Sequence, residues 1–345
     1  MTQEYYFRPE MLGGITASNG HLATFPGMQL IRKDPKKSFV PAAIIKEISP
    51  KLSLHDLPSP LKIEGFPEDE YEIVSLLGAG SYSAVYKALR RSTGEYVALK
   101  IHRHGEAFLV AGILEAAITL KFQQNNCFLP LLDVFVGPNC HFTTVMPMAS
   151  ASLESVKKID HNIDYMISII KPLLQSLSLL HNAGLVHTDV KPENILFWGD
   201  RPYLIDFGSV VFASECHSRA VLQTPIYRSP EMVIMRKISP SIDIWSVGCI
   251  TYELLRGIAF FNPTRDSQLL ECIIKEFGPM PSVYKANGDF SYSWVQTHRL
   301  QILERELSPD SRAGAAIEFI RECMNLDFTQ RLEASELLKL PLFAE

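Results

Sequence analysis

The chain has 345 residues, 47% of them hydrophobic and 21% charged, with a formal net charge of −5 at pH 7. This length and composition suit a globular protein with a sizeable core, built as one large domain or two modest ones. The negative balance argues against nucleic acid as the main partner, because a phosphate backbone is bound by a basic face. The six cysteines are scattered without a C-x-x-C pair, so we expect reduced thiols rather than a disulfide frame or a zinc site.

Residues 1–70 differ from the rest of the chain, with scattered prolines and no long periodic pattern. They predict an irregular, partly disordered N-terminal extension. The first residues, M-T-Q-E, lack the basic start and apolar stretch of a signal peptide, and no segment reaches the ~18 uninterrupted apolar residues that would span a bilayer. We therefore expect an intracellular protein, in the nucleus, the cytoplasm or both, with no membrane partner. The basic cluster at residues 32–37 is either a nuclear-import patch or solvated charge.

From Tyr71 onwards the pattern is that of a β-rich region. Between the third and fourth predicted strands, apolar residues recur at helical spacing from Ala107 to Ile118, which predicts a helix. Short apolar segments separated by turn signals predict five strands: Tyr71–Leu77, Ala84–Leu89, Tyr96–Ile101, Phe128–Val136 and His141–Met146.

The remainder of the chain has a mostly helical pattern. The strongly apolar stretch Asp164–Leu180 predicts a long helix with its stop at Gly184, and Pro172 is expected to kink or break that helix. We therefore predict an α+β fold with two lobes. The small β-rich N-lobe would span about 71–147, and the larger α-helical C-lobe about 148–344.

The first chemically informative segment is G-A-G-S-Y-S-A-V at residues 78–85. Small residues between two strands let backbone N–H groups approach phosphates closely. An ordinary hairpin turn has a similar composition, and a dinucleotide-binding loop also uses G-x-G-x-x-G. In a dinucleotide-binding loop, however, the third glycine opens a helix, whereas here Ser83 takes that place and Val85 belongs to a predicted strand.

A lysine and a glutamate follow at positions where an ion pair is expected. Lys100 ends the apolar run V-A-L-K, and a lysine there is costly unless it meets an anion. Glu115 lies on the following predicted helix and can supply the carboxylate. The pair would hold Lys100 against the α- and β-phosphates of a nucleotide. Taken singly, each residue is also explained as ordinary surface charge.

Two further motifs carry groups suited to phosphoryl transfer. In H-T-D-V-K-P-E-N at residues 187–194, Asp189 can accept a hydroxyl proton and Lys191 can neutralise charge on the transferred group. Asn194 can bind Mg²⁺ through its amide oxygen, and Asp206, in the D-F-G at 206–208, can bridge the metal to the β- and γ-phosphates. A lone D-F-G is common by chance, but H-x-D-x-K-x-x-N followed by a strand and D-F-G is not.

These motifs, in this order and spacing, resemble the eukaryotic protein kinase superfamily from Tyr71 to Phe343, roughly four-fifths of the chain. The resemblance implies a bilobal protein kinase domain over residues 71–344, which uses ATP with Mg²⁺ or Mn²⁺. It implies a catalytic set consisting of Asp189, Lys191 and Thr224, and a metal-contacting set of Asn194 and Asp206. The implied ATP-contacting set is Leu77, Gly78, Ala79, Gly80, Ser81, Val85, Ala98, Lys100, Glu115, Met146, Met148 and Leu196.

The same resemblance predicts three contacts outside the reacting groups. Thr224 should hydrogen-bond the region of Asp189. Glu231 should pair with a buried arginine, for which Arg331 stands at the family's position. Asp243 should brace the backbone of the 187–194 segment.

Within the superfamily, Y-R-S-P-E at 227–231 and F-G-P-M-P at 277–281 resemble the CMGC group. The H-T-D at 187–189, together with D-F-G-S at 206–209, looks most like the LAMMER and SR-protein kinase branch. Thr188 departs from the family pattern, because it replaces an arginine that normally pairs with a phosphorylated activation loop, so strict control by loop phosphorylation is not expected.

The sequence therefore predicts an ATP- and Mg²⁺-dependent serine/threonine kinase that acts on protein substrates, with Asp189 as the catalytic base. The alternatives are dual specificity and a pseudokinase that serves as a nucleotide-binding scaffold. Glu193 and Glu154 lie where related kinases contact basic residues, which suggests an arginine-rich substrate, although two surface carboxylates have a plainer explanation. We expect a monomer.

Overall fold

The structure, a computed structural model, describes residues 70–80, 82–103, 105–136, 141–156, 162–213, 222–235, 237–284 and 298–344. The predicted N-terminal extension lies outside these residues except for Glu70. The described chain divides into two compact units. The first contains the residues up to Ser150 and the segment Ile205–Ser209, and the second contains Ala151–Leu204 and the residues from Val210 onwards.

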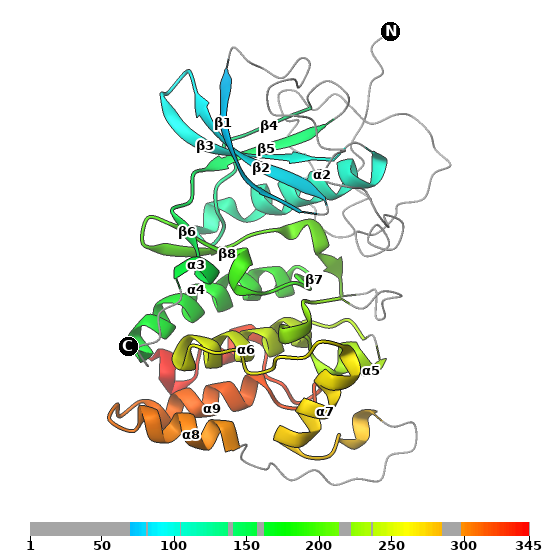
Figure 1. Cartoon of the computed structure of the whole chain (residues 1–345), viewed down its shortest axis with the longest axis vertical. Coiled ribbons are helices and arrows are strands. Elements are labelled where there is room, and N and C mark those ends of the chain that lie inside the picture. Colours follow the sequence, from blue (N-terminus) through cyan, green and yellow to red (C-terminus); the bar gives the residue numbers. More distant parts are fainter. Residues whose placement is uncertain are drawn as a thin grey trace. The chain divides into compact units, whose positions relative to one another are not determined.

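The first unit is built on a five-stranded antiparallel sheet (Figure 1). Its strands are β1 (Tyr71–Ala79), β2 (Ser83–Arg90), β3 (Glu95–His102), β4 (Asp133–Val136) and β5 (Phe142–Pro147), in the order β1-β2-β3-β5-β4. Alternate residues of β2 and β3 join residues of β1 and β5 in one buried cluster, which includes Tyr71, Tyr86, Leu99 and Val145. The apolar segments that predicted the strands thus supply the residues of this buried cluster.

The predicted strand Phe128–Val136 is too long, because only its last four residues form β4. Phe128 is buried through aromatic packing instead. Its ring stacks on that of Phe122 with centroids 5.2 Å apart and lies 5.4 Å from the ring of Phe207. An apolar run can fill a core through its side chains without joining a sheet, so the pattern alone overstated the strand.

The predicted helix is α2 (Glu106–Phe122), which packs against β3, β5 and the short 3-10 turn Phe207–Ser209. Its residues from Ala111 to Thr119 are all buried except Ala117, so the helix is enclosed on nearly every side. The Thr119 hydroxyl donates to the carbonyl oxygen of Glu115 at 2.9 Å, which satisfies a polar group inside this apolar contact.

The second unit is mainly helical and, with the β-rich first unit, confirms the predicted α+β class. Its strands form a three-stranded sheet in the order β6-β8-β9 and a two-stranded sheet of β7 and β10. The strands are β6 (Ala151–Ser152), β7 (Leu185–Val186), β8 (Ile195–Trp198), β9 (Arg201–Leu204) and β10 (Val211–Phe212). The helices are α3 (Leu153–Val156), α4 (Ile163–Asn182), α5 (Pro230–Met235), α6 (Ser241–Arg256), α7 (Asp266–Phe277), α8 (His298–Leu307), α9 (Ala313–Cys323) and α10 (Ala334–Leu337).

The sequence predicts that Pro172 kinks or breaks the helix; α4 runs through it as one element, so the break is wrong and the kink stays a prediction. Proline removes one backbone hydrogen bond, but Ile170 and Leu173 on either side of it are buried, and their packing holds the helical path. The helix ends at Asn182, and Gly184 follows with a φ of +73°, which confirms the predicted glycine stop.

Among the described residues, α4 is the one helix that is long and apolar enough to cross a membrane by length and composition. Half of this stretch is buried inside the protein. It packs against α6 and α10, and a core helix of a folded domain passes the same test.

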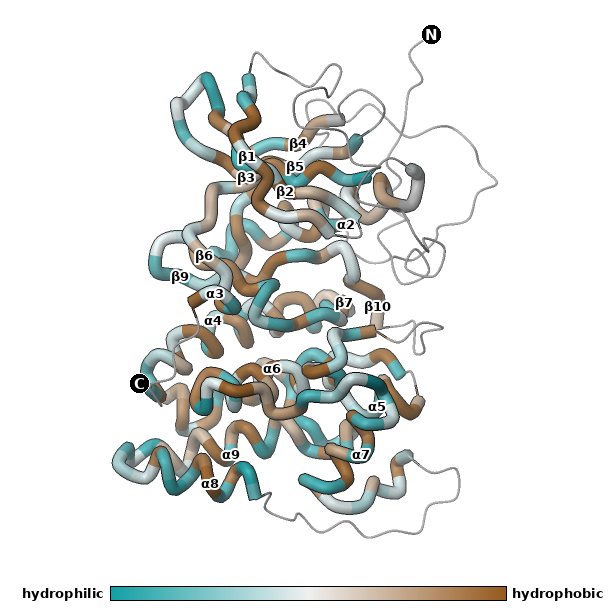
Figure 2. The backbone as a smooth tube through the Cα atoms, in the orientation of Figure 1, coloured by the Kyte–Doolittle hydropathy of each residue, from teal (hydrophilic) through white to brown (hydrophobic). Residues whose placement is uncertain are grey.

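The helix α6 forms the buried centre of the second unit, and every residue from Ile242 to Leu255 is buried. Figure 2 shows hydrophobic residues recurring along it. Gly248 allows the residues that end α9 to come close, because a Cβ at this position would lie 2.5 Å from Met324 Cγ and 2.8 Å from Cys323 Cβ. Such close packing makes α6 a rigid support for the segments attached to it.

Candidate functional site

Three charged side chains meet in the first unit. The sheet register places Lys100 on β3 beside Val85 of β2 and Thr144 of β5. The Lys100 Nζ donates to the two carboxylate oxygens of Glu115 at 2.6 and 2.7 Å and to Asp206 Oδ1 at 2.9 Å. The predicted contact between Lys100 and Glu115 is confirmed, and Asp206 shares the same ammonium.

The charges in this cluster stabilise one another. Burial on its own would raise the pKa of Glu115, but the Lys100 ammonium and the His102 ring outweigh burial and hold that pKa below its usual value. Burial also disfavours the charged form of Lys100, yet the carboxylates of Asp206 and Glu115 raise the pKa of this lysine. Lys100 and Glu115 therefore remain ionised at neutral pH, as a paired buried cation and anion should.

The glycine-rich segment forms the turn between β1 and β2. The Gly80 N–H donates to the carbonyl oxygen of Ser83 at 2.8 Å and closes the turn. Arg103, just past β3, ties the turn to the sheet, because its guanidinium donates to Gly80 O at 3.0 Å and its backbone N–H donates to Tyr82 O at 2.9 Å. Ser81 lies outside the described residues. The turn is thus held by hydrogen bonds to its backbone atoms.

The other predicted ATP contacts fall on both units. Ala98 and Met146 are direct partners in the register of β3 and β5, so they share one place on the sheet. Leu196 lies on β8 and is the one described member of the set that belongs to the second unit. The described members in the first unit are Leu77, Gly78, Ala79, Gly80, Val85, Ala98, Lys100, Glu115, Met146 and Met148.

The second unit brings the predicted catalytic side chains together. Thr224 Oγ1 donates to Asp189 Oδ1 at 2.8 Å, and Lys191 Nζ donates to Asp189 Oδ2 at 2.8 Å. Lys191 Nζ also donates to Thr224 Oγ1 at 3.2 Å, so the predicted contact of Thr224 is confirmed. The Asn194 Nδ2 donates to the backbone carbonyl of Asp189 at 2.9 Å, which leaves the amide oxygen as the Asn194 atom suited to a cation.

Asp243 of α6 braces the backbone that carries these residues, as predicted. Its Oδ2 accepts the His187 N–H at 2.7 Å, and its Oδ1 accepts the Thr188 N–H at 2.9 Å. His181 Nε2 lies 3.0 Å from the same Oδ2. Thr188 has a φ of +70°, a conformation that is unfavourable for a β-branched residue, so the brace holds a strained backbone in place.

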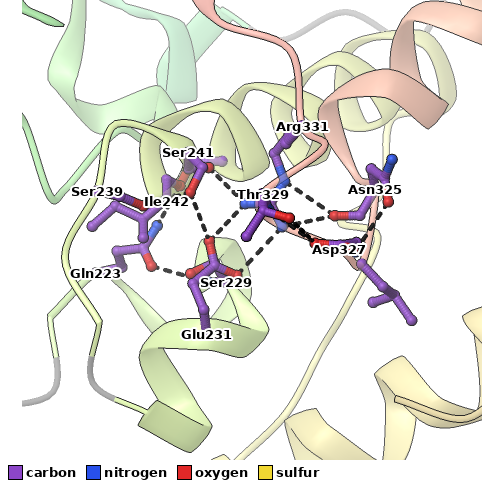
Figure 3. A network of polar contacts seen from close by, with 12 residues as sticks. Gln223, Ser229, Glu231, Ser239, Ser241, Ile242, Asn325, Asp327, Thr329 and Arg331 are labelled. Atoms are coloured by element: carbon purple, nitrogen blue, oxygen red, sulfur yellow. Dashed lines mark hydrogen bonds and ion pairs between the residues drawn. The ribbon is translucent and has the colours of Figure 1, made fainter. Parts of the chain in front are cut away.

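The predicted pair of Glu231 and Arg331 is also confirmed (Figure 3). The side chains of both residues are fully buried. Arg331 Nη1 donates to Glu231 Oε1 at 2.7 Å and to the Ser241 carbonyl at 2.7 Å. Its Nη2 donates to the Asn325 carbonyl at 2.8 Å. The pair thereby fastens the segment after Thr224 to the start of α6 and to the turn that follows α9.

Gln223 was not predicted, yet it organises the same segment (Figure 3). Its Nε2 donates to the Ile242 carbonyl at 2.8 Å and to Ser246 Oγ at 2.9 Å, while its Oε1 accepts the Ser229 N–H at 3.0 Å. A glutamine outside any periodic pattern carries no sequence signal for such a role. His102 was missed as well, although its position two residues after Lys100 on one strand places both side chains on the same face.

Comparisons with known proteins agree with this geometry. A family model described as "Protein kinase domain" matches residues 71–343. The chain is 35% identical to the probable serine/threonine-protein kinase dyrk2 of Dictyostelium discoideum, over 78% of this chain and 32% of that protein. It is 29% identical to the dual specificity protein kinase lkh1 of Schizosaccharomyces pombe, over 80% of this chain and 47% of that protein.

A third relative is matched over most of its length. Cyclin-dependent kinase-like 1 of Caenorhabditis elegans is 31% identical, over 80% of this chain and 81% of that protein. The chain thus spans less than half the length of the first two relatives, 32% and 47%, and most of the length of the third.

Proposed function

This chain belongs to the protein kinase family, and from that membership we propose that it transfers the γ-phosphate of ATP to serine or threonine hydroxyls of protein substrates. Several relatives are named as DYRK-family or dual-specificity kinases, as expected for the CMGC group. The observation that best supports the proposal is the set of contacts that Asp189 makes with Lys191 and Thr224. Phosphoryl transfer depends on such a base to orient the attacking hydroxyl.

In the proposed mechanism, Asp189 accepts the proton of the substrate hydroxyl. Thr224 and Lys191 each donate to a different oxygen of its carboxylate, so the base is held in one orientation. Lys191 also offsets negative charge on the transferred group. The rate enhancement then comes mainly from positioning and from electrostatic stabilisation.

Lys100 is proposed to hold the α- and β-phosphates, with Glu115 fixing its ammonium. Mg²⁺, when bound, neutralises phosphate charge, and Asn194 and Asp206 suit it because each offers a side-chain oxygen. Among the described residues, no group of three or more His, Cys, Asp or Glu side chains gathers as a metal site. In the proposed site, the phosphates of the nucleotide supply further oxygen ligands.

The function is tested by assaying the purified chain with radiolabelled ATP and a generic basic protein. We expect incorporation of phosphate that requires Mg²⁺ or Mn²⁺ and stops when the metal is chelated. Nucleotide binding without incorporation under either metal would instead support the pseudokinase alternative. Phospho-amino-acid analysis of the product separates serine/threonine from dual specificity, which the names of several relatives make the second candidate.

An arginine-rich substrate is proposed from the charges near Tyr227. Burial raises the pKa of the Tyr227 hydroxyl, and the carboxylate of Glu253, followed by those of Glu193 and Glu154, raises it further. Tyr227 donates to Glu253 Oε2 at 2.7 Å, whereas Glu193 and Glu154 are exposed. The two exposed carboxylates thus form a negative surface that can attract cationic side chains.

In a positional-scanning peptide library, we expect a preference for arginine upstream of the phosphorylated residue. Changing Glu193 and Glu154 to glutamine together should weaken that preference about tenfold, since each lost charge pair is worth a fraction of a kcal/mol to 1 kcal/mol at an exposed site. Glu318→Gln, an exposed carboxylate on α9, is the matched control and should leave the preference unchanged. Indifference of the unmodified chain to upstream arginine would contradict this substrate class.

A further inference from the structure

The ring of His102 lies between α2 and β5, almost wholly buried, and contacts both elements. Its Nδ1 is 3.1 Å from the carbonyl oxygen of Phe142, and its Nε2 is 3.3 Å from Glu115 Oε2. The same Glu115 oxygen accepts from Lys100 Nζ at 2.7 Å. His102 therefore touches the carboxylate on which the Lys100 cluster depends, and it does so from the same strand as Lys100.

Both atoms that face the ring are acceptors. A backbone carbonyl and a carboxylate have no proton to donate, so the ring satisfies both contacts only when each of its nitrogens carries a proton. Among the described residues, the other charged or titratable groups near the ring are Lys100, Asp206 and His141. The Lys100 ammonium donates to Asp206, and His141 Nδ1 lies 2.7 Å from the backbone oxygen of His102. A ring protonated on both nitrogens adds a second cation beside Glu115.

The helix α2 is shaped to receive this ring. Gly112 lies in its interior, where glycine is less favourable than alanine. A Cβ on Gly112 would lie 3.0 Å from His102 Nδ1, 3.1 Å from His102 Cε1 and 2.5 Å from Phe142 Cδ1. The absence of a side chain at this point lets α2 approach the imidazole and the Phe142 ring closely. Gly112 therefore leaves the space that the His102 ring occupies.

We propose that His102 is a positioning residue, which donates from Nε2 to Glu115 and from Nδ1 to the Phe142 carbonyl and so locks α2 to β5 with the Glu115 carboxylate aimed at Lys100. This inference rests on the proposed function, since Lys100 is its point of action. The two contacts of His102 would fix α2 to β5 within the first unit.

Steady-state kinetics with His102→Leu and His102→Gln test the proposal. Leucine fills similar space without a donor, and we expect kcat/KM for ATP to fall about tenfold, the equivalent of one charge-assisted hydrogen bond. Glutamine keeps an N–H donor, and its kcat/KM for ATP should lie within about threefold of the wild-type value. Thr144→Val is the matched control, because the Thr144 hydroxyl is buried on β5 without a hydrogen-bond partner among the described residues, and it should be neutral.

Rescue by glutamine distinguishes positioning from mere packing, because glutamine keeps a donor whereas leucine only fills the space. Equal losses in the leucine and glutamine variants would overturn the proposal.

A measurement that needs no turnover separates this inference from the function itself. In the nitrogen-15 spectrum of the labelled imidazole at neutral pH, His102 Nε2 should carry a proton in the full chain, whether or not the chain transfers phosphate. A bare Nε2 would refute the lock even in an active kinase. A protonated Nε2 in a chain without transferase activity would support the contact and contradict the proposed function.

Discussion

Asp189→Asn is expected to abolish phosphoryl transfer while leaving nucleotide binding largely intact. Asparagine has nearly the same shape, and its one amide oxygen can still accept from Thr224 or from Lys191, so one of the two contacts at 2.8 Å is kept. It cannot take up the hydroxyl proton. Because a positioned general base contributes typically 10²–10⁴-fold, we expect the single-turnover rate to fall by about 10³-fold or more.

The control for this variant is Asp200→Asn. Asp200 is an exposed carboxylate in the turn between β8 and β9 of the same unit, and its loss should leave the rate and the nucleotide Kd unchanged. Comparing the two variants by rapid quench and by fluorescent nucleotide titration separates chemistry from binding. Wild-type turnover in Asp189→Asn would eliminate Asp189 as the base.

Arg331→Ala is expected to lower the free energy of unfolding by about 3–5 kcal/mol, because it leaves the Glu231 carboxylate buried without its cation. The side chains of both residues are 0% exposed, and the guanidinium also donates to the carbonyls of Ser241 and Asn325. Urea unfolding followed by intrinsic fluorescence measures the change.

Two further variants sharpen this result. Arg312→Ala removes an arginine whose partners Asp164 and Asp310 are on the surface, and it should shift the unfolding midpoint very little. The double change Glu231→Gln with Arg331→Met should recover part of the loss, since no uncompensated charge remains. If Arg331→Ala unfolds at the wild-type urea concentration, the buried pair does not hold this segment.

Much of the site could be predicted because its residues recur at fixed spacing in a recognisable order. The contacts Lys100–Glu115, Thr224–Asp189 and Glu231–Arg331 all followed from that order. The strands of the first unit could be predicted for a different reason, because they are short apolar segments separated by turn residues. Both kinds of signal are local in sequence or fixed by motif.

The features that sequence reasoning missed depend on tertiary packing. Nothing local shows that the Phe128 ring stacks on Phe122 rather than extending a strand, or that buried neighbours keep α4 helical through Pro172. The roles of His102 and Gln223 likewise depend on partners from distant segments. The predicted domain boundaries at residues 70 and 147 remain predictions.

The brace from Asp243 has a consequence for how the protein is made. The two N–H groups that it holds belong to residues 56 and 55 positions earlier in the chain. Since synthesis proceeds from the N-terminus, a nascent chain carries Asp189, Lys191 and Asn194 before it carries the helix that sets their strained backbone. The brace therefore forms only after α6 has left the ribosome, so on the proposed function a growing chain lacks the positioned catalytic backbone until then.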